Sequence, residues 1–325
     1  MADYKVSYFK SAKKIVNTSS AFSLRKWLKY INFPKKGRIY MNLAKPSELK
    51  ALLERHGFSF SKSLGQNFLI DENVLDKIVS TSELLSESCV LEIGPGAGVL
   101  TRRLAQTGAK CVAVEIDKAL IPVLSESMGE FENFTLINED ILKVDIHKLV
   151  QEEFSGKPFH VIANLPYYIT TPIVMKLLEE KLPVESMTLM VQKEVADRMC
   201  AKSGGKDYGA LSVAVQYYSS PCVICKAEPH CFMPQPKVAS SVVHLEVGDT
   251  PTVSVNDEKK FFAVVKSAFG QRRKTLLNAL SKSPYITVEK AKVTEVLSDM
   301  GLSADIRGEK LSIEQFAEFS NKLFV

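Results

Sequence analysis

The sequence predicts an α/β protein with a mixed, mostly parallel sheet of seven strands, followed by a small helical domain. From about residue 85, short apolar runs alternate with amphipathic stretches, the pattern of a parallel sheet with helices on both faces. After the segment VGDTPTV at 247–253, the apolar spacing becomes helical up to the C-terminus. We therefore place a domain boundary near residue 248.

The strands and helices of this sheet can be placed in order along the chain. We expect strands at residues 89–93, 110–117, 134–138, 160–164, 187–192, 211–218 and 240–247. Between the first two, GAGVLTRRLAQTG forms an amphipathic helix that Gly108 ends, and further helices are expected at 118–128 and near 171–180. No clear helix separates the last two strands, which predicts an antiparallel pair at the sheet edge.

These elements divide the chain into a larger domain at 41–247 and a small helical domain at 248–325, preceded by residues 1–40. This first segment contains ten Lys or Arg and a single acid, Asp3, and has no long apolar run typical of a secretory signal. We interpret it as a disordered basic extension. An organelle transit peptide, a basic arm that touches RNA and a misassigned start codon are the alternatives.

Composition excludes some classes of protein. The net charge is +5, but residues after 40 hold 32 basic and 36 acidic side chains, so global charge does not indicate RNA binding. The sequence contains no run of 18 or more apolar residues, so it predicts no membrane-spanning helix.

The cysteines Cys222, Cys225 and Cys231, near His230, suggest a zinc site. The single CxxC lies in a strand-like apolar run, however, which favours buried thiols and no metal.

Three strand ends carry side chains suited to one nucleotide-like ligand. EIGPGAG, from Glu92 to Gly98, brings flexible backbone and a helix N-terminus together, with GxGxG spacing instead of GxGxxG. Glu115, at the end of the next strand, can accept both hydroxyls of a ribose. Asp140, after the third strand, can accept from an adenine amine, although alone it would be read as a helix N-cap. Because strands in such sheets end at one edge, the three together predict a binding site.

The fourth strand ends in NLPY, residues 164–167. With it, the set resembles a class I S-adenosylmethionine-dependent methyltransferase that acts on an exocyclic amine. More narrowly, SKSLGQNFLID, LEIGPGAGVLT, VAVEIDK, NLPYYITTPI, VQKEVADRM, YGALSVAVQ, FMPQPKVASSVV and AFGQRRKTLLNAL resemble the small-subunit ribosomal RNA adenine N6,N6-dimethyltransferases. The resemblance runs from about residue 45 to the C-terminus.

This resemblance implies a chemical role for NLPY. An adenine N6 needs acceptors that aim its lone pair at a methyl sulfonium, and the Asn164 side-chain oxygen and the Leu165 carbonyl can accept its two N–H groups. Pro166 fixes the backbone, and Tyr167 offers a face on which an extruded base stacks. Phe232, in FMPQPKV, would form the second wall of this base sandwich.

The resemblance also implies the remaining site residues. The cofactor, S-adenosylmethionine, would contact Gln66, Asn67, Leu69, Glu92, Gly94, Gly96, Gly98, Glu115, Ile116, Asp140, Ile141 and Asn164. Four basic residues at the start of the helical domain would contact RNA phosphates, namely Lys266, Arg272, Arg273 and Lys274. Without the resemblance, a solvated helix face explains these four equally well.

We expect an enzyme that places two methyl groups on each of two adjacent adenosines in the 3′-terminal hairpin of small-subunit rRNA. It would work as a monomer in the cytoplasm on a pre-ribosomal particle, or in an organelle if residues 1–40 are a transit peptide. The alternatives are an erythromycin-resistance type methyltransferase acting on large-subunit rRNA, a binding factor with a vestigial site, and a dinucleotide oxidoreductase. The glycine spacing disfavours the last.

Overall fold

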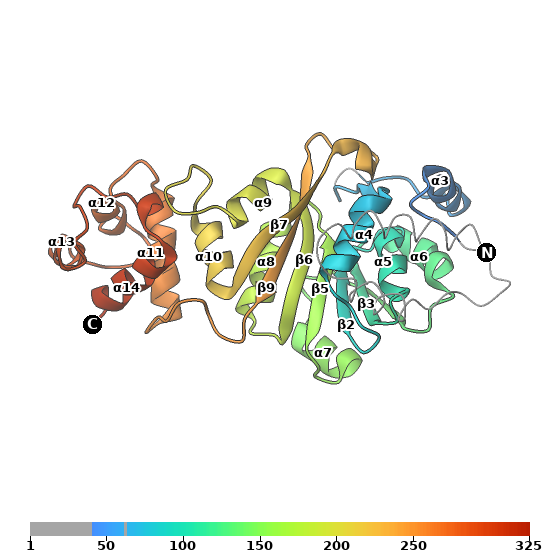
Figure 1. The fold of residues 1–325 in the computed structure, drawn as a ribbon, viewed down its shortest axis with the longest axis horizontal. Coiled ribbons are helices and arrows are strands. Elements are labelled where there is room, and N and C mark those ends of the chain that lie inside the picture. Colours follow the sequence, from blue (N-terminus) through green and yellow to red (C-terminus); the bar gives the residue numbers. More distant parts are fainter. Residues whose placement is uncertain (1–40, 62–63) are drawn as a thin grey trace, which may run out of the picture.

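The computed structural model describes residues 41–61 and 64–325, so the predicted extension at 1–40 lies outside the described residues. Seven strands form one sheet (Figure 1). They are β2 Cys89–Ile93, β3 Lys110–Glu115, β4 Phe134–Asn138, β5 Phe159–Asn164, β6 Val184–Gln192, β7 Ser219–Ala227 and β9 Ser240–Val247. Their order is β4-β3-β2-β5-β6-β9-β7; β9 runs antiparallel to β6 and β7, and the other neighbours are parallel. The predicted mixed sheet of seven strands is confirmed.

Helices cover both faces of this sheet. They are α3 Pro46–Arg55, α4 Glu72–Thr81, α5 Val99–Ala105, η1 Lys118–Leu120, α6 Ile121–Met128, α7 Ile146–Phe154, α8 Thr170–Glu179, α9 Lys193–Met199 and α10 Ala210–Tyr218. Successive strand residues point to opposite faces. Val90 and Ile162 therefore belong to the core beneath α4, α5 and α6, whereas Leu91 and Val161 belong to the core beneath α7 and α8. The sheet is thus buried on both sides, as its apolar strands require.

The predicted strand at 211–218 is wrong, because these residues form α10 and the edge strand is β7, at 219–227. Nearly every residue of α10 is buried, so the segment lacks the polar face that marks an amphipathic helix. A short, continuous apolar run does not distinguish a buried helix from a strand. The Gln216 side chain donates to the Met199 and Ala201 carbonyls at the end of α9, which fixes α10 against that helix.

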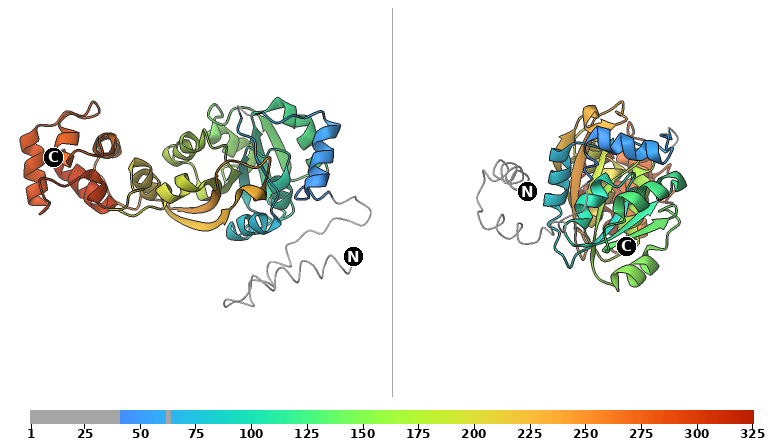
Figure 2. Two further views of the ribbon diagram at one scale, coloured as in Figure 1. Left: turned by 90° about the horizontal axis from the view of Figure 1, so that it is seen from above. Right: turned by 90° about the vertical axis from the view of Figure 1, so that its right-hand side faces the viewer.

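After β9 the described chain contains helices and no strand. These helices are α11 Glu258–Gly270, α12 Leu276–Leu280, α13 Lys290–Asp299, η3 Gly308–Lys310 and α14 Ile313–Leu323. They gather at one end of the molecule beyond α10 and extend away from the sheet (Figures 1 and 2). Aromatic rings join them to α10: the centroids of Tyr217 and Phe261 lie 5.1 Å apart, and those of Tyr218 and Phe262 lie 5.8 Å apart. The assignment of 248–325 as a separate domain stays a prediction.

A second, two-stranded sheet connects distant parts of the chain. β1, Phe68–Leu69, pairs antiparallel with β8, Phe232–Met233, which follows the short helix η2, Pro229–Cys231. The Ile70 N–H donates to the Cys231 carbonyl at 2.8 Å and continues the pairing. Residues 64–69 are thereby attached to the segment just before β9.

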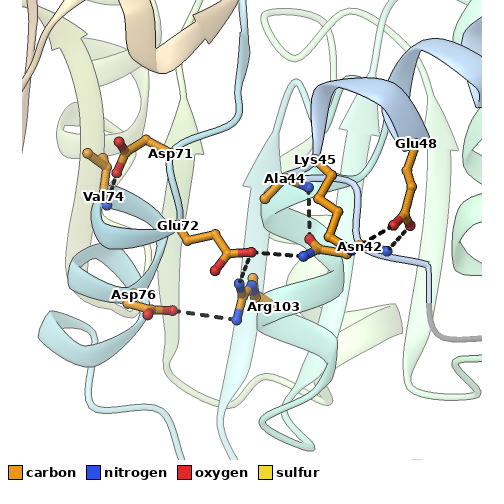
Figure 3. A network of polar contacts seen from close by, with 9 residues as sticks. All are labelled: Asn42, Ala44, Lys45, Glu48, Asp71, Glu72, Val74, Asp76 and Arg103. Atoms are coloured by element: carbon orange, nitrogen blue, oxygen red, sulfur yellow. Dashed lines mark hydrogen bonds and ion pairs between the residues drawn. The ribbon is translucent and has the colours of Figure 1, made fainter. Parts of the chain in front are cut away.

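The first described residues are held by a polar network at the corner of α3, α4 and α5 (Figure 3). Asn42 Nδ2 donates to Glu72 Oε1 at 2.8 Å. The Arg103 guanidinium lies 3.9 Å from Glu72 Oε1 and 3.5 Å from Asp76 Oδ1. Burial raises the pKa of Asp76, and the Arg103 charge acts in the opposite direction. The network fixes α4, and therefore the C-terminal end of the segment that leads through β1.

None of the described helices is long and apolar enough to cross a membrane.

Candidate active site

A cleft lies at the carboxyl ends of β2, β3, β4 and β5. Residues 64–68 form one wall, and strand-end residues form the rest. Of the residues predicted to form the site, the cleft is lined by Gln66, Asn67, Gly94, Gly96, Glu115, Ile116, Asp140, Ile141, Asn164, Leu165, Pro166 and Tyr167. Leu69, Glu92, Gly98 and Phe232 do not line it.

The glycine turn after β2 brings backbone to the cleft wall. Gly94 and Gly96 have φ angles of +68° and +62°, which residues with a Cβ rarely adopt. A Cβ on Gly96 would also lie 2.7 Å from Cε1 of Phe68, a residue of β1. Glycine at 96 therefore lets the segment before α4 pack directly on the turn. Gly98 lies outside the cleft at the N-cap of α5.

Glu115 ends β3 with a buried carboxyl group that already has two N–H donors. Its Oε2 accepts from the Gly96 N–H at 3.2 Å, and its Oε1 accepts from the Asp117 N–H at 2.8 Å. Burial raises the pKa of Glu115 to about 7, although these N–H groups favour the ionised form. Each oxygen retains a lone pair for a further donor, so the group suits a pair of hydroxyls.

Glu92 is placed differently from the sequence-based expectation. Its side chain is 2% exposed and lies beside α5, on the face of the sheet that carries Val90. Burial raises the pKa of Glu92 to about 8, so the carboxyl group is mostly neutral at pH 7. Within the described residues, Glu92 Oε2 and Thr101 Oγ1 are both buried without a hydrogen-bond partner.

Asp140 and two isoleucines form the end of the cleft near β4. Asp140 Oδ1 accepts from the Leu142 N–H at 3.0 Å, which fixes the turn, and Oδ2 lies 3.9 Å from Lys143 Nζ. Ile116 is 46% exposed beside Glu115, whereas Ile141 is buried. An exposed apolar side chain next to two carboxyl groups suits a flat ring whose edge carries hydrogen-bond donors.

Asn164 connects the fourth strand end to the wall formed by residues 64–68. Its Nδ2 donates to the Asn67 carbonyl at 2.9 Å, which leaves Oδ1 as the acceptor atom of this amide. Asn67 Nδ2 in turn donates to the Gly65 carbonyl at 2.8 Å. Gln66 Nε2 donates to Asp117 Oδ2 at 2.6 Å, next to Glu115. These bonds join the wall to both β3 and β5.

The rest of NLPY is anchored as well. The Leu165 N–H donates to the Met190 carbonyl of β6 at 3.0 Å, and the Leu165 side chain is buried. The Tyr167 hydroxyl lies 2.6 Å from Ser240 Oγ, at the start of β9. The ring of Tyr167 is thus held at the cleft by a residue 73 positions away in sequence.

Phe232 was predicted as a wall of a base sandwich, but the structure does not place it in the cleft. Its side chain is 2% exposed and belongs to the core that includes Leu69 and Phe68. Phe232 pairs with Leu69 across the two-stranded sheet, and both side chains are buried. In this conformation neither side chain offers a surface to a ligand.

Tyr168 lines the cleft although sequence reasoning did not select it. It is 56% exposed, a large fraction for an aromatic residue next to a strand end. The sequence feature that could have indicated Tyr168 as a cleft residue is its position directly after NLPY.

The four basic residues predicted to contact phosphates are exposed, but their surroundings differ. Lys266, on α11, lies over the Tyr285 ring with its Nζ 4.1 Å from the centroid. Arg272 donates to the Lys206 and Tyr208 carbonyls at 2.7 and 3.2 Å and lies 3.7 Å from Glu309. Arg273 and Lys274 lie in the same turn between α11 and α12. Arg272 therefore also has a structural role.

The cysteines near His230 lie in or next to β7 and β8, and the described residues contain no group of three or more His, Cys, Asp or Glu that could hold a metal ion.

Comparison with known proteins gives consistent matches over most of the chain. A model of the family described as ribosomal RNA adenine dimethylase matches residues 57–323. The chain is 53% identical over 281 residues to a ribosomal RNA small subunit methyltransferase A of Alkaliphilus oremlandii, which covers 86% of this chain and 98% of the relative. A protein of the same name from Clostridioides difficile is 49% identical over 279 residues, with coverage of 86% and 96%.

Two solved structures are similar as well. A dimethyladenosine transferase from Plasmodium falciparum has a TM-score of 0.64 at 24% identity, covering 78% of this chain and 95% of its own. The 23S rRNA methyltransferase ErmE has a TM-score of 0.62 at 25% identity, covering 79% and 99%.

Proposed function

Because the chain belongs to the ribosomal RNA adenine dimethylase family, we propose that it transfers methyl groups from S-adenosylmethionine to N6 of two adjacent adenosines in the 3′-terminal hairpin of small-subunit rRNA. The fold is that of class I methyltransferases, and the family makes the protein an rRNA adenine methyltransferase. The observation that carries the proposal is the meeting of Glu115, Asp140 and NLPY in one cleft.

The cleft residues fit S-adenosylmethionine. Glu115 offers carboxylate oxygens to the ribose hydroxyls, Asp140 accepts from the adenine amine, and Ile116 packs on the adenine ring. Gly94 and Gly96 line the cleft with backbone, and their positive φ angles form the tight turn after β2. When bound, S-adenosylmethionine supplies an electrophilic methyl group.

The chain itself contributes orientation. The adenine N6 lone pair is delocalised into the ring, so the protein must aim it at the methyl group, and a strong base is not needed. Asn164 Oδ1 and the Leu165 carbonyl accept the two N–H groups, while Tyr167, held by Ser240, stacks on the base. Once the amine nitrogen has gained one methyl group and lost one proton to solvent, a single N–H remains, so the base must re-seat before the second transfer.

Methyl transfer from labelled S-adenosylmethionine to purified small and large ribosomal subunits tests this proposal. We expect label in the small subunit alone, as N6,N6-dimethyladenosine. Label in the large subunit would instead support the ErmE-like alternative, which the higher identity to small-subunit enzymes disfavours. No transfer to either would leave the binding-factor alternative.

We further propose that the enzyme acts as a monomer in the cytoplasm on a pre-ribosomal particle. The bacterial relatives support this location. The organelle alternative depends on residues 1–40, outside the described residues.

Cofactor affinity should depend on pH through Glu115. The pKa of this carboxyl group is raised from 4.5 to about 7, so it is largely neutral at pH 6, whereas the ribose favours the ionised acceptor. Calorimetry should show S-adenosylmethionine binding about ten-fold more weakly at pH 6 than at pH 8, since one proton must leave. Glu115→Gln should bind more weakly at pH 8, by roughly 1.5 to 3 kcal/mol, and lose this part of the pH dependence.

The raised pKa of Glu115 also affects the stability of the protein without ligand. A raised pKa in the folded protein means that stability from this group is present below pH 4.5 and is lost as pH rises through about 7. In thermal melts of the free protein, the stability of Glu115→Gln relative to wild type should therefore increase from about pH 4.5 to about pH 7 and stay constant at higher pH. An identical pH dependence of ligand binding in both proteins would remove Glu115 from the cofactor site.

Arg273 and Arg272 should behave differently when each is replaced by alanine. Arg273→Ala should weaken rRNA binding and lower the slope of log affinity against log salt concentration by roughly 1, with thermal stability unchanged. Arg272→Ala should also lower stability, because it removes the bonds to the Lys206 and Tyr208 carbonyls. An unchanged salt slope in Arg273→Ala would make this residue part of a solvated surface.

A further inference from the structure

Tyr168 is an exposed aromatic residue inside the candidate active site. Of the large apolar side chains that are exposed in the described residues, Ile116 and Tyr168 line the cleft. Ile116 lies at the end that suits the cofactor adenine. Tyr168 lies at the opposite end, after β5, where the proposed function places the RNA. The proposed cofactor contacts leave this ring unused.

The Tyr168 ring lies beside Gly65. Gly65, in the wall formed by residues 64–68, has φ +60°, and a Cβ built there would lie 3.7 Å from Tyr168 Cδ1. The ring therefore lies close to this wall, while more than half of the residue remains exposed. A flat ring that lies at a cleft wall and remains largely exposed is suited to stacking on a base.

Tyr168 and Tyr167 are directed to different elements. Tyr167 reaches Ser240 of β9 through its hydroxyl, whereas Tyr168 lies next to Gly65. The turn between them is closed by the Ile169 N–H, which donates to the Pro166 carbonyl at 3.2 Å. Because the two side chains contact different elements, we assign them to two separate bases.

We propose that Tyr168 stacks on a nucleotide that flanks the target adenine in the RNA. This inference rests on the proposed function, in which the target stacks on Tyr167. Stacking needs only the π-face of the base, so the same contact accepts an unmodified or an already methylated neighbour. Tyr168 would thereby hold the strand in register while either adenosine is being methylated.

The test compares Tyr168→Ala and Tyr168→Phe with wild type on a hairpin RNA that carries the two adjacent adenosines. In matched RNAs, each nucleotide flanking the target is made abasic in turn, and methylation is counted at the target adenosine alone. On the intact RNA, Tyr168→Ala should lower kcat/KM by about 10- to 100-fold, mainly through KM. Tyr168→Phe keeps the ring and should match wild type.

The abasic RNAs decide which base is involved. Removing the stacked base should lower wild-type kcat/KM by a similar factor and abolish the difference between wild type and Tyr168→Ala. Affinity for S-adenosylmethionine should be unchanged in both variants. The inference is overturned if Tyr168→Ala equals wild type on intact RNA, if its loss persists on both abasic RNAs, or if cofactor affinity falls. Failure of the wild-type enzyme to methylate intact RNA would overturn the proposed function itself, and this inference with it.

Discussion

Replacing Asn164 with alanine should lower kcat by about 10²- to 10³-fold while the protein still folds and still binds cofactor and rRNA. Asn164 Nδ2 is held by the Asn67 carbonyl, so Oδ1 is preorganised as an acceptor. An acceptor aimed at the amine matters most in the reacting geometry, when the nitrogen becomes more positive. Single-turnover methylation of small-subunit rRNA, with saturating cofactor, measures this step.

The substitution also breaks the bond to Asn67, so a matched control is needed. Asn67→Ala keeps the carbonyl that Asn164 uses but loses the side-chain bond to Gly65. It should loosen the same wall and raise the KM for cofactor with a much smaller change in kcat. Equal kcat losses in both variants would assign the effect to the wall, and full activity in Asn164→Ala would overturn the proposed role of NLPY.

Replacing Phe232 with alanine should destabilise the protein by about 3 to 5 kcal/mol. The ring is buried in the core beside Leu69 and Phe68, and its removal leaves a cavity where the two-stranded sheet packs. Urea denaturation should show a large fall in the midpoint. Under conditions where the variant is folded, the ratio of monomethyladenosine to dimethyladenosine should remain that of wild type.

Two variants calibrate this measurement. Phe232→Leu retains most of the volume and should cost much less stability than alanine. Tyr168→Ala removes an exposed ring and should leave the midpoint nearly unchanged. If Phe232→Ala instead keeps the wild-type midpoint and accumulates monomethyladenosine, the ring enters the cleft during the reaction and forms the base-sandwich wall implied by the resemblance.

The sequence predicts the sheet well where pattern and turn signals agree. The strand at 134–138 has the predicted bounds, and β2 and β9 do as well. The strand prediction at 211–218 is wrong because α10 is enclosed by protein. A continuous apolar run indicates that a segment is buried, but it does not distinguish a helix from a strand. Tertiary contacts, such as those of Gln216 with the end of α9, decide whether this segment forms a helix or a strand.

In the site, too, some residues are placed by the order of the strands and others by contacts between distant parts of the chain. Glu115, Asp140 and Asn164 meet because parallel strands end at one edge of the sheet, a rule that holds for any sheet of this class. The burial of Phe232 and the exposure of Tyr168 depend on how residues 64–69 cross that edge. That path is set by pairing with residues more than 160 positions later, which local pattern does not encode.

The pairing of β1 with β8 has a consequence for the order in which the enzyme becomes functional. During synthesis, residues 68 and 69 emerge long before residues 232 and 233, their partners. Tyr167 likewise waits for Ser240. A nascent chain that has folded its first parallel strands therefore lacks both the closed wall and the anchored ring, because such non-local contacts form late. Catalytic competence should arise only after Ser240 has left the ribosome, so translation itself delays the first turnover.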